Sequence, residues 1–221
     1  MRDEKAQPES VQVQTPDAAL SGDLTTPANA VAIALFAHGS GSSRLSSRNR
    51  FVASELNSRG IATLLFDLLT ETEDKVDQVT REHRFDIPLP SKRLVGAIDW
   101  LAGRADVSQL PVALFGASTG AAAALNAAAS RSQLISSVIS RGGRPDLAPD
   151  ALSHVRAPTL LIVGESDEPV IEMNRSAARL LRCEHTVEIV PGATHLFEEP
   201  GALEQVSALA GDWILRHAPS D

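Results

Sequence analysis

Short runs of β-branched and aliphatic residues alternate along the chain with segments whose apolar residues recur every three or four positions. The runs are expected to be strands at residues 31–37, 62–69, 111–115, 134–139, 159–163 and 186–190. Most are apolar at nearly every position, which is typical of parallel strands that helices cover on both faces. Two upstream segments, 11–14 and 19–24, are predicted to form an antiparallel edge.

Helical spacing fills the gaps between these runs. One apolar stripe includes Leu94, Ile98 and Leu101, a second recurs through residues 203–214, and residues 121–129 are almost pure helix formers. The alternation of strand and helix predicts an α/β fold, namely a doubly wound, mostly parallel sheet with helices on both faces.

The domain organisation follows from the same pattern. We expect a flexible polar tail over residues 1–10 and a single α/β domain over 11–221, because no linker or repeat interrupts the pattern. The segment 140–158 is too short for a large cap domain. Residues 70–90 are charged and irregular, and they are predicted to form a loop at the rim of a site.

Composition narrows the classes of function. The chain is 43% hydrophobic and carries 20 Lys plus Arg against 28 Asp plus Glu, a net charge of −8, which argues against a nucleic-acid partner. The single cysteine, Cys183, excludes an intramolecular disulfide. It is not accompanied by the further Cys and His residues that a structural zinc site needs, so no metal is expected. The start of the chain does not read as a secretory signal and no run is long enough to span a membrane, which predicts a cytoplasmic protein without membrane partners.

The strand at 111–115 leads into Gly116-Ala117-Ser118-Thr119-Gly120 and then directly into a helix. A strand that turns at once into a helix strains the central residue, and flanking glycines remove Cβ atoms that would clash there. Ser118 is therefore expected at the carboxyl edge of the sheet and at a helix N-terminus, where developing negative charge is favoured.

A serine hydroxyl becomes a useful nucleophile when a neighbouring base takes its proton and an acid orients that base. The strand at 159–163 ends in a loop containing Asp167, and the next strand ends in a loop containing His195. The chain order Ser118, Asp167, His195 is the order of a hydrolase triad of this type.

The acid has competitors. Glu165 and Glu168 share the loop of Asp167, and Asp146 follows the preceding strand, from which some hydrolases take their acid. The sequence favours Asp167 and keeps Asp146 as the alternative.

The turn His38-Gly39-Ser40-Gly41 follows the strand at 31–37. Such a turn supplies one backbone donor for a tetrahedral intermediate, so the oxyanion donors are predicted to be the amides of Ser40 and Thr119.

Further candidates for contact with the substrate lie nearby. His38 either shapes the turn or contacts the substrate, while Arg141 and Arg144 either favour an anionic substrate or brace a loop.

With these motifs in place, the chain resembles the α/β-hydrolase superfamily, and within it the small, capless, dienelactone-hydrolase-like esterases, from about Val31 to His217. It also resembles hydrolase modules found joined to phosphoribosyltransferase domains. Dienelactone hydrolases carry cysteine at the elbow, whereas this chain carries Ser118, so the resemblance implies general ester hydrolysis rather than that particular lactone hydrolysis.

The sequence therefore predicts a serine esterase that acts on small esters or thioesters with short or medium acyl groups. Alternatives are an amidase, peptidase or acyltransferase with the same triad, or a non-catalytic binding or scaffold protein. No cofactor is expected, because Arg44 replaces the third glycine that a dinucleotide fingerprint beginning at Gly39 would need.

Overall fold

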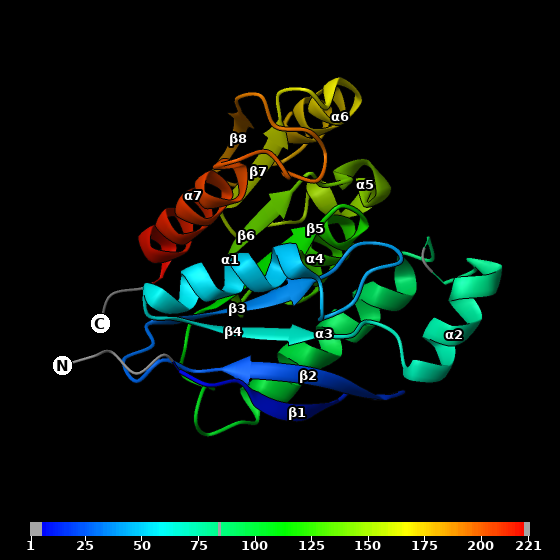
Figure 1. Cartoon of the computed structure of the whole chain (residues 1–221), viewed down its shortest axis with the longest axis vertical. Helices are drawn as coiled ribbons and strands as arrows, with labels where there is room; N and C mark the ends of the chain where they lie inside the picture. The colour runs from blue at the N-terminus through cyan, green and yellow to red at the C-terminus, as the bar shows by residue number, and fades with distance from the viewer. Residues whose placement is uncertain (1–5, 84, 219–221) are drawn as a thin grey trace.

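The computed structural model describes residues 6–83 and 85–218, and within them eight strands form one sheet in the order β1-β2-β4-β3-β5-β6-β7-β8 (Figure 1). The strands are β1 Glu9–Gln14, β2 Ala19–Thr25, β3 Ala32–Ala37, β4 Ile61–Phe66, β5 Val112–Ala117, β6 Ile135–Arg141, β7 Thr159–Gly164 and β8 His185–Val190. The helices are α1 Ser47–Ser58, α2 Glu71–Thr80, α3 Pro88–Ala102, α4 Thr119–Ser130, η1 Pro145–Leu147, α5 Pro149–Leu152, α6 Glu168–Ala178 and α7 Ala202–His217.

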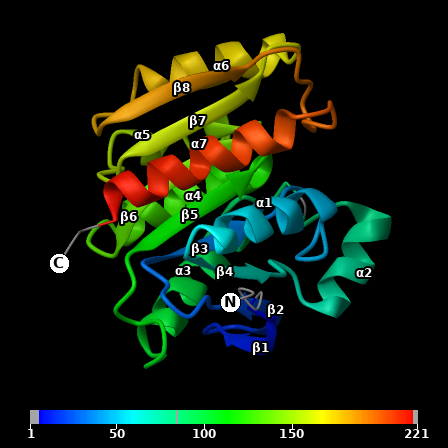
Figure 2. The same ribbon diagram turned by 60° about the vertical axis from the view of Figure 1, so that its left-hand side comes forward.

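The topology confirms the predicted fold class. Strands β3 to β8 are parallel, whereas β2 is antiparallel to β4 and β1 is antiparallel to β2, as expected for the edge. One apolar cluster packs α1 and α7 on one face, and the other packs α3 to α6 on the opposite face (Figure 2). All six loops at the carboxyl ends of the parallel strands therefore meet at one edge.

The prediction of an irregular loop over residues 70–90 was wrong, because α2 occupies Glu71–Thr80 and α3 begins at Pro88. A capping box starts α2: the Thr70 hydroxyl accepts from the Glu73 amide at 3.3 Å, and the Glu73 carboxylate accepts from the Thr70 amide at 2.7 Å. Asp77 is the one buried residue of the helix, so α2 lacks the apolar stripe by which helices are recognised in a sequence.

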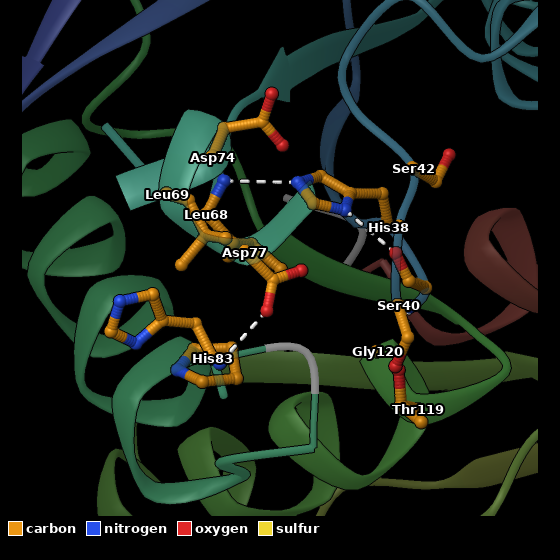
Figure 3. A pocket seen from close by; sticks show the side chains of 13 residues that line it. His38, Ser40, Ser42, Leu68, Leu69, Asp74, Asp77, His83, Thr119 and Gly120 are labelled. Carbon is orange, nitrogen blue, oxygen red and sulfur yellow. Dashed lines mark hydrogen bonds between the residues drawn. The ribbon is translucent and has the colours of Figure 1, made fainter. Parts of the chain in front are cut away.

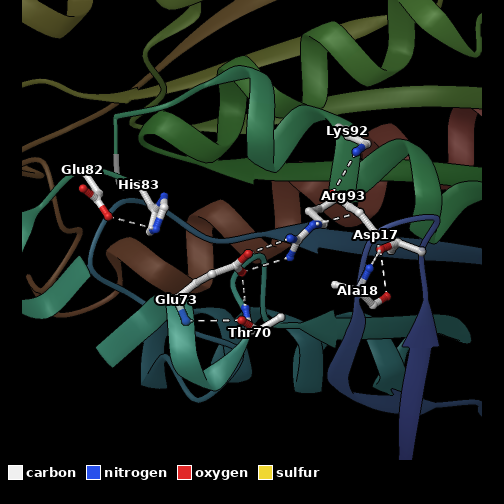
Figure 4. Close-up of polar contacts among 9 residues, drawn as sticks. Asp17, Ala18, Thr70, Glu73, Glu82, His83, Lys92 and Arg93 are labelled. Atoms are coloured by element: carbon white, nitrogen blue, oxygen red, sulfur yellow. Dashed lines mark hydrogen bonds and ion pairs between the residues drawn. The ribbon is translucent and has the colours of Figure 1, made fainter. Parts of the chain in front are cut away.

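Arg93 of α3 links α2 to α3 and to the turn between β1 and β2 (Figure 4). Its buried guanidinium contacts Glu73 at 2.9 and 3.2 Å and forms an ion pair with Asp17 at 3.2 Å. One side chain thus connects α2, α3 and the turn between β1 and β2, which keeps α2 beside the carboxyl edge.

The N-terminal boundary of the domain and the end of β4 differ from the expected ones. The first strand begins at Glu9, inside the expected tail, of which residues 1–5 lie outside the described part of the chain. Strand β4 ends at Phe66, before the predicted 69. No helix within 6–83 or 85–218 has the length and hydropathy required to cross a bilayer.

Candidate active site

Ser118 lies between β5 and α4 with φ 52° and ψ −121°, a strained conformation for a residue with a side chain. The glycines around it are needed because chain segments approach closely. A Cβ at Gly116 would lie 2.6 Å from the Gly120 carbonyl oxygen, and one at Gly120 would lie 2.6 Å from the His38 carbonyl oxygen. The predicted strand-turn-helix elbow is therefore present, and it packs directly on the turn that contains His38.

The loop after β6 supports this elbow. The Ser118 amide donates to the Arg141 carbonyl at 3.1 Å, and the Ser118 carbonyl accepts from the Arg144 amide at 3.0 Å. The Ser118 side chain is half-buried, and its hydroxyl makes no hydrogen bond to any described residue. The backbone of Ser118 is thus fixed while its hydroxyl is left available.

Asp167 and His195 are brought together across the ends of two neighbouring strands. Nδ1 of His195 lies 2.6 Å from Oδ2 of Asp167, whose side chain is 13% exposed against 39% for the histidine. Because the carboxylate accepts a hydrogen bond from the Nδ1–H group, the neutral imidazole has its lone pair at Nε2. This is the tautomer that a general base for a serine requires.

The loop that carries His195 rests on the loop that supports Ser118. A Cβ at Gly142 would lie 3.1 Å from the His195 carbonyl oxygen, and the preceding residue, Arg141, holds the Ser118 amide. Among the hydrogen bonds of the described residues there is none between Ser118 and His195, so proton transfer between them requires a shift of one side chain or a bridging water.

Phe197 anchors this loop, and the sequence reasoning missed it. Its side chain is fully buried and its φ is 56°, so it fixes the chain two residues after His195 in a conformation that is unfavourable for a bulky residue. The aromatic side chain two residues after His195 was the available signal.

The other acids that the sequence left open have different partners. Asp146 accepts two hydrogen bonds from Arg144, at 2.8 and 2.7 Å. Glu165 accepts from the Gly192 amide at 2.8 Å and so braces the histidine loop, while Glu168 is the exposed first residue of α6. Asp167 is the carboxylate that contacts His195.

The predicted oxyanion donors differ in availability. The Ser40 amide donates to the Thr119 hydroxyl at 2.9 Å, and the two side-chain hydroxyls are 2.8 Å apart. The Thr119 amide has no acceptor within the described residues, as expected for the first turn of α4. One predicted donor is therefore free, and the other is occupied in this structure.

His38 has a structural place in the turn. Its Nε2 accepts from the Leu68 amide at 3.0 Å, so Nδ1 carries the proton and donates to the Gly39 carbonyl at 3.0 Å. Burial lowers the pKa of His38, against smaller opposing effects of the Gly39 carbonyl, Asp67 and Asp74. A neutral His38 thus connects the glycine-rich turn to the segment after β4, and both ring nitrogens are used in doing so.

The two arginines expected near the site differ from each other. Arg144 is paired with Asp146, which matches the loop-bracing alternative. Arg141 is only 7% exposed, and burial, followed by the charge of Arg48, lowers its pKa to about 10.

A small recess with a cavity volume of about 30 Å³ lies beside the elbow (Figure 3). Its wall includes Ser40 and Thr119 on one side and the α2 region on the other, where Asp74, Asp77 and His83 are found. The segment expected at the rim of the site therefore does line it, although as a helix. Within the described residues no three His, Cys, Asp or Glu side chains are grouped as metal ligands.

Comparison with known sequences agrees with this architecture. The profile of the Dienelactone hydrolase family matches residues 22–213. Two curated proteins of Mycobacterium tuberculosis, from strains H37Rv and CDC 1551, are 53% identical over 209 residues, and their names propose phosphoribosyl transferase activity. The match covers 95% of this chain but 46% of each relative, so the chain spans about half the length of those proteins.

Solved structures place the chain in the same group. A dienelactone hydrolase from Anabaena variabilis has a TM-score of 0.96 and 53% identity, covering 98% of this chain and 100% of that one. Est1E from Butyrivibrio proteoclasticus, solved with ferulic acid, has a TM-score of 0.80 at 17% identity, covering 94% and 98%, and shares the fold. With a profile match over most of its length, the chain belongs to the dienelactone hydrolase family.

Proposed function

We propose that this chain is a serine hydrolase that cleaves carboxylic esters or thioesters with short or medium acyl groups through an acyl-enzyme on Ser118. Membership of the dienelactone hydrolase family supports a hydrolase. The observation that carries the finer proposal is the 2.6 Å contact between Asp167 and His195. The loop of His195 packs on Gly142, in the loop that supports the strained backbone of Ser118.

In the proposed reaction, Nε2 of His195 removes the hydroxyl proton of Ser118 as the oxygen attacks the acyl carbonyl. Asp167 holds the proton on Nδ1 and stabilises the imidazolium that forms. His195 then protonates the leaving alcohol or thiol, and the Ser118 ester remains. A water molecule, deprotonated by His195, releases the acid and restores the serine.

The carbonyl oxygen becomes negatively charged in both tetrahedral intermediates. We propose that the amides of Thr119 and Ser40 stabilise it, each donor contributing about 10²- to 10³-fold in rate. Since the Ser40 amide is bound to the Thr119 hydroxyl, this assignment requires that hydroxyl to rotate away when substrate enters.

The surroundings favour a small acyl group. The recess beside Ser40 and Thr119 has a cavity volume of about 30 Å³, which leaves room for a small group only. Its wall mixes Leu68 and Leu69 with the charged Asp74 and Asp77, which suits a short acyl chain better than a long lipid tail.

Labelling with a fluorophosphonate and mapping of the adduct tests the proposal. We expect one adduct on Ser118, none in Ser118→Ala, and unchanged labelling in Ser58→Ala, a control at an exposed serine at the end of α1. Failure of the folded protein to react would support the non-catalytic alternative instead.

A graded panel of p-nitrophenyl esters defines the specificity. We expect kcat/KM to be highest for short or medium acyl groups, and a large preference for long-chain esters contradicts the proposal. Matched anilides, peptides and added alcohol acceptors in the same assay distinguish amidase, peptidase and acyltransferase activity. The transferase activity in the relatives' names concerns proteins about twice as long, and no residue of the present site requires it.

A further inference from the structure

Arg141, the last residue of β6, is a buried cation without a counter-ion among the residues that the structure describes. The residue is 7% exposed, and its Nε and Nη1 atoms are closed off from solvent. None of its nitrogens forms a hydrogen bond or ion pair with residues 6–83 or 85–218. Nη2 is the guanidinium nitrogen that is not enclosed, so an approaching ligand meets this end of the side chain first.

The charged neighbour of Arg141 is a second cation. The positive charge of Arg48, in the first turn of α1, opposes protonation of Arg141 and adds to the larger effect of burial, so its pKa falls to about 10. Arg48 itself bonds to Glu198 at 3.0 Å through Nη1, while its Nε is enclosed and unpaired. Glu198 is 64% exposed and therefore offsets the combined charge only weakly.

A comparison within the same protein shows how unusual this is. Arg93 is also buried, but Glu73 and Asp17 neutralise it. An enclosed cation without a partner is destabilising by several kcal/mol unless an anion accompanies it. Arg141, with Arg48 as a second positive charge nearby, therefore forms a site that an oxyanion would complete, because the planar fork of arginine matches a carboxylate or a phosphate.

The pair lies close to the proposed nucleophile. The carbonyl of Arg141 accepts the hydrogen bond from the Ser118 amide, and the next residue, Gly142, packs against His195. An anion on the Arg141 side chain would therefore be held by a residue whose backbone directly contacts Ser118.

We propose that Arg141, assisted by Arg48, binds an oxyanion beside Ser118, either a carboxylate or a phosphate group. The anion has two possible sources, namely an acidic group on the substrate and a free inorganic anion. The first source rests on the proposed hydrolase function, whereas binding itself does not.

Inorganic phosphate, compared with chloride at equal ionic strength, tests binding by thermal unfolding and calorimetry. We expect phosphate to raise the Tm of the wild-type chain, because a ligand that binds the folded state stabilises it. The shift should disappear in Arg141→Met and persist in Arg144→Gln, which removes the same charge from the same loop but from a paired arginine.

The stability of Arg141→Met without phosphate distinguishes a ligand-binding role of Arg141 from a structural one. Without phosphate, Arg141→Met should be as stable as the wild type or more stable, since it removes an unpaired buried charge. If Arg141→Met does not fold, Arg48→Met, whose side chain is 30% exposed, provides the second test and should weaken phosphate binding.

Two p-nitrophenyl esters of similar size, one neutral and one bearing a carboxylate on its acyl group, identify the source. If the substrate supplies the anion, the ratio of kcat/KM for the acidic over the neutral ester falls about tenfold or more in Arg141→Met and is kept in Arg144→Gln. A phosphate-dependent Tm with an unchanged ratio assigns the site to a free anion. Absence of both effects in the wild type overturns the proposal, and if no ester is cleaved the phosphate measurement alone decides.

Discussion

The backbone amide of Ser40 donates a hydrogen bond of 2.9 Å to the hydroxyl of Thr119, a residue 79 positions further along the chain. The contact joins the glycine-rich turn after β3 to the first residue of α4. It also occupies one of the two amides to which the oxyanion is assigned, so substrate binding and this contact compete for the same proton.

Thr119→Val tests that competition. The variant keeps the branched shape of the side chain and removes the hydroxyl acceptor, so Thr119 no longer competes for the Ser40 amide. We expect kcat for a short-chain ester to be maintained or raised. A loss of 10²- to 10³-fold in kcat would instead mean that the Thr119 hydroxyl itself stabilises the oxyanion. Circular dichroism and the Tm of the variant provide the control for folding.

Asp167→Asn should lower kcat by about 10⁴-fold, because the amide no longer holds the imidazole in the productive tautomer. Steady-state kinetics on a short-chain ester provide the measurement, with Asp146→Asn as the matched variant. Asp146 is bound to Arg144, so its loss should affect kcat far less. The reverse order of these two effects would identify Asp146 as the acid.

Gly120→Ala should destabilise the fold by at least about 1–3 kcal/mol, because the added Cβ would lie 2.6 Å from a backbone oxygen of His38. Chemical denaturation measures this effect. Gly103→Ala is the control, since its Cβ would lie 3.5 Å from the nearest atom. That variant should be unchanged or stabilised by up to about 1 kcal/mol. Equal behaviour of the two variants would contradict the close packing of the elbow.

The pH dependence of stability should contain a contribution from His38. Burial lowers its pKa in the folded state from the ordinary 6.5, so the unfolded chain takes up a proton before the folded chain does. Stability from this group is therefore complete above pH 6.5 and declines as the pH falls below it, by at most about 1.4 kcal/mol per unit.

The measurement for His38 is denaturant unfolding of the wild type and His38→Asn at neutral and mildly acidic pH. The stability difference between them should shrink as the pH falls. A difference that stays constant would show that His38 is protonated to the same extent in the folded and unfolded chain.

Arg93→Met should lower the free energy of unfolding by about 1–3 kcal/mol, because Glu73 and Asp17 lose their shared charged donor. Relative to the wild type, the variant should exchange amide hydrogens faster in α2, and the change should be larger there than in α6. The reason is that Arg93 attaches α2 to the rest of the protein. Arg131→Met, which breaks an exposed pair with Asp99, serves as the control. Unaltered exchange in α2 would show that its capping box suffices.

Much of the architecture could be predicted because local patterns have local causes. The apolar runs marked β3, β5 and β7 because strands covered on both faces are almost entirely apolar. The glycines around Ser118 marked the elbow because the strain and crowding arise within five consecutive residues. The order of Ser118, Asp167 and His195 placed all three at one edge once the sheet was parallel.

Helix α2 could not be found in the same way. It buries Asp77 rather than an apolar stripe, and Arg93, distant in the chain, holds it in place. Its formation depends on a capping box and on charge pairing, neither of which produces hydrophobic periodicity.

The sequence by itself determines the strands, the serine elbow and the set of candidate acids and bases, because each follows from the spacing of neighbouring residues. The tertiary structure decided that Asp167 rather than Asp146 meets His195, that Thr119 binds the Ser40 amide, and that Arg141 is buried without a carboxylate. These outcomes depend on which distant loops pack together and on the solvent they displace. Hydrogen bonding and desolvation act through space, and only the folded chain determines those distances.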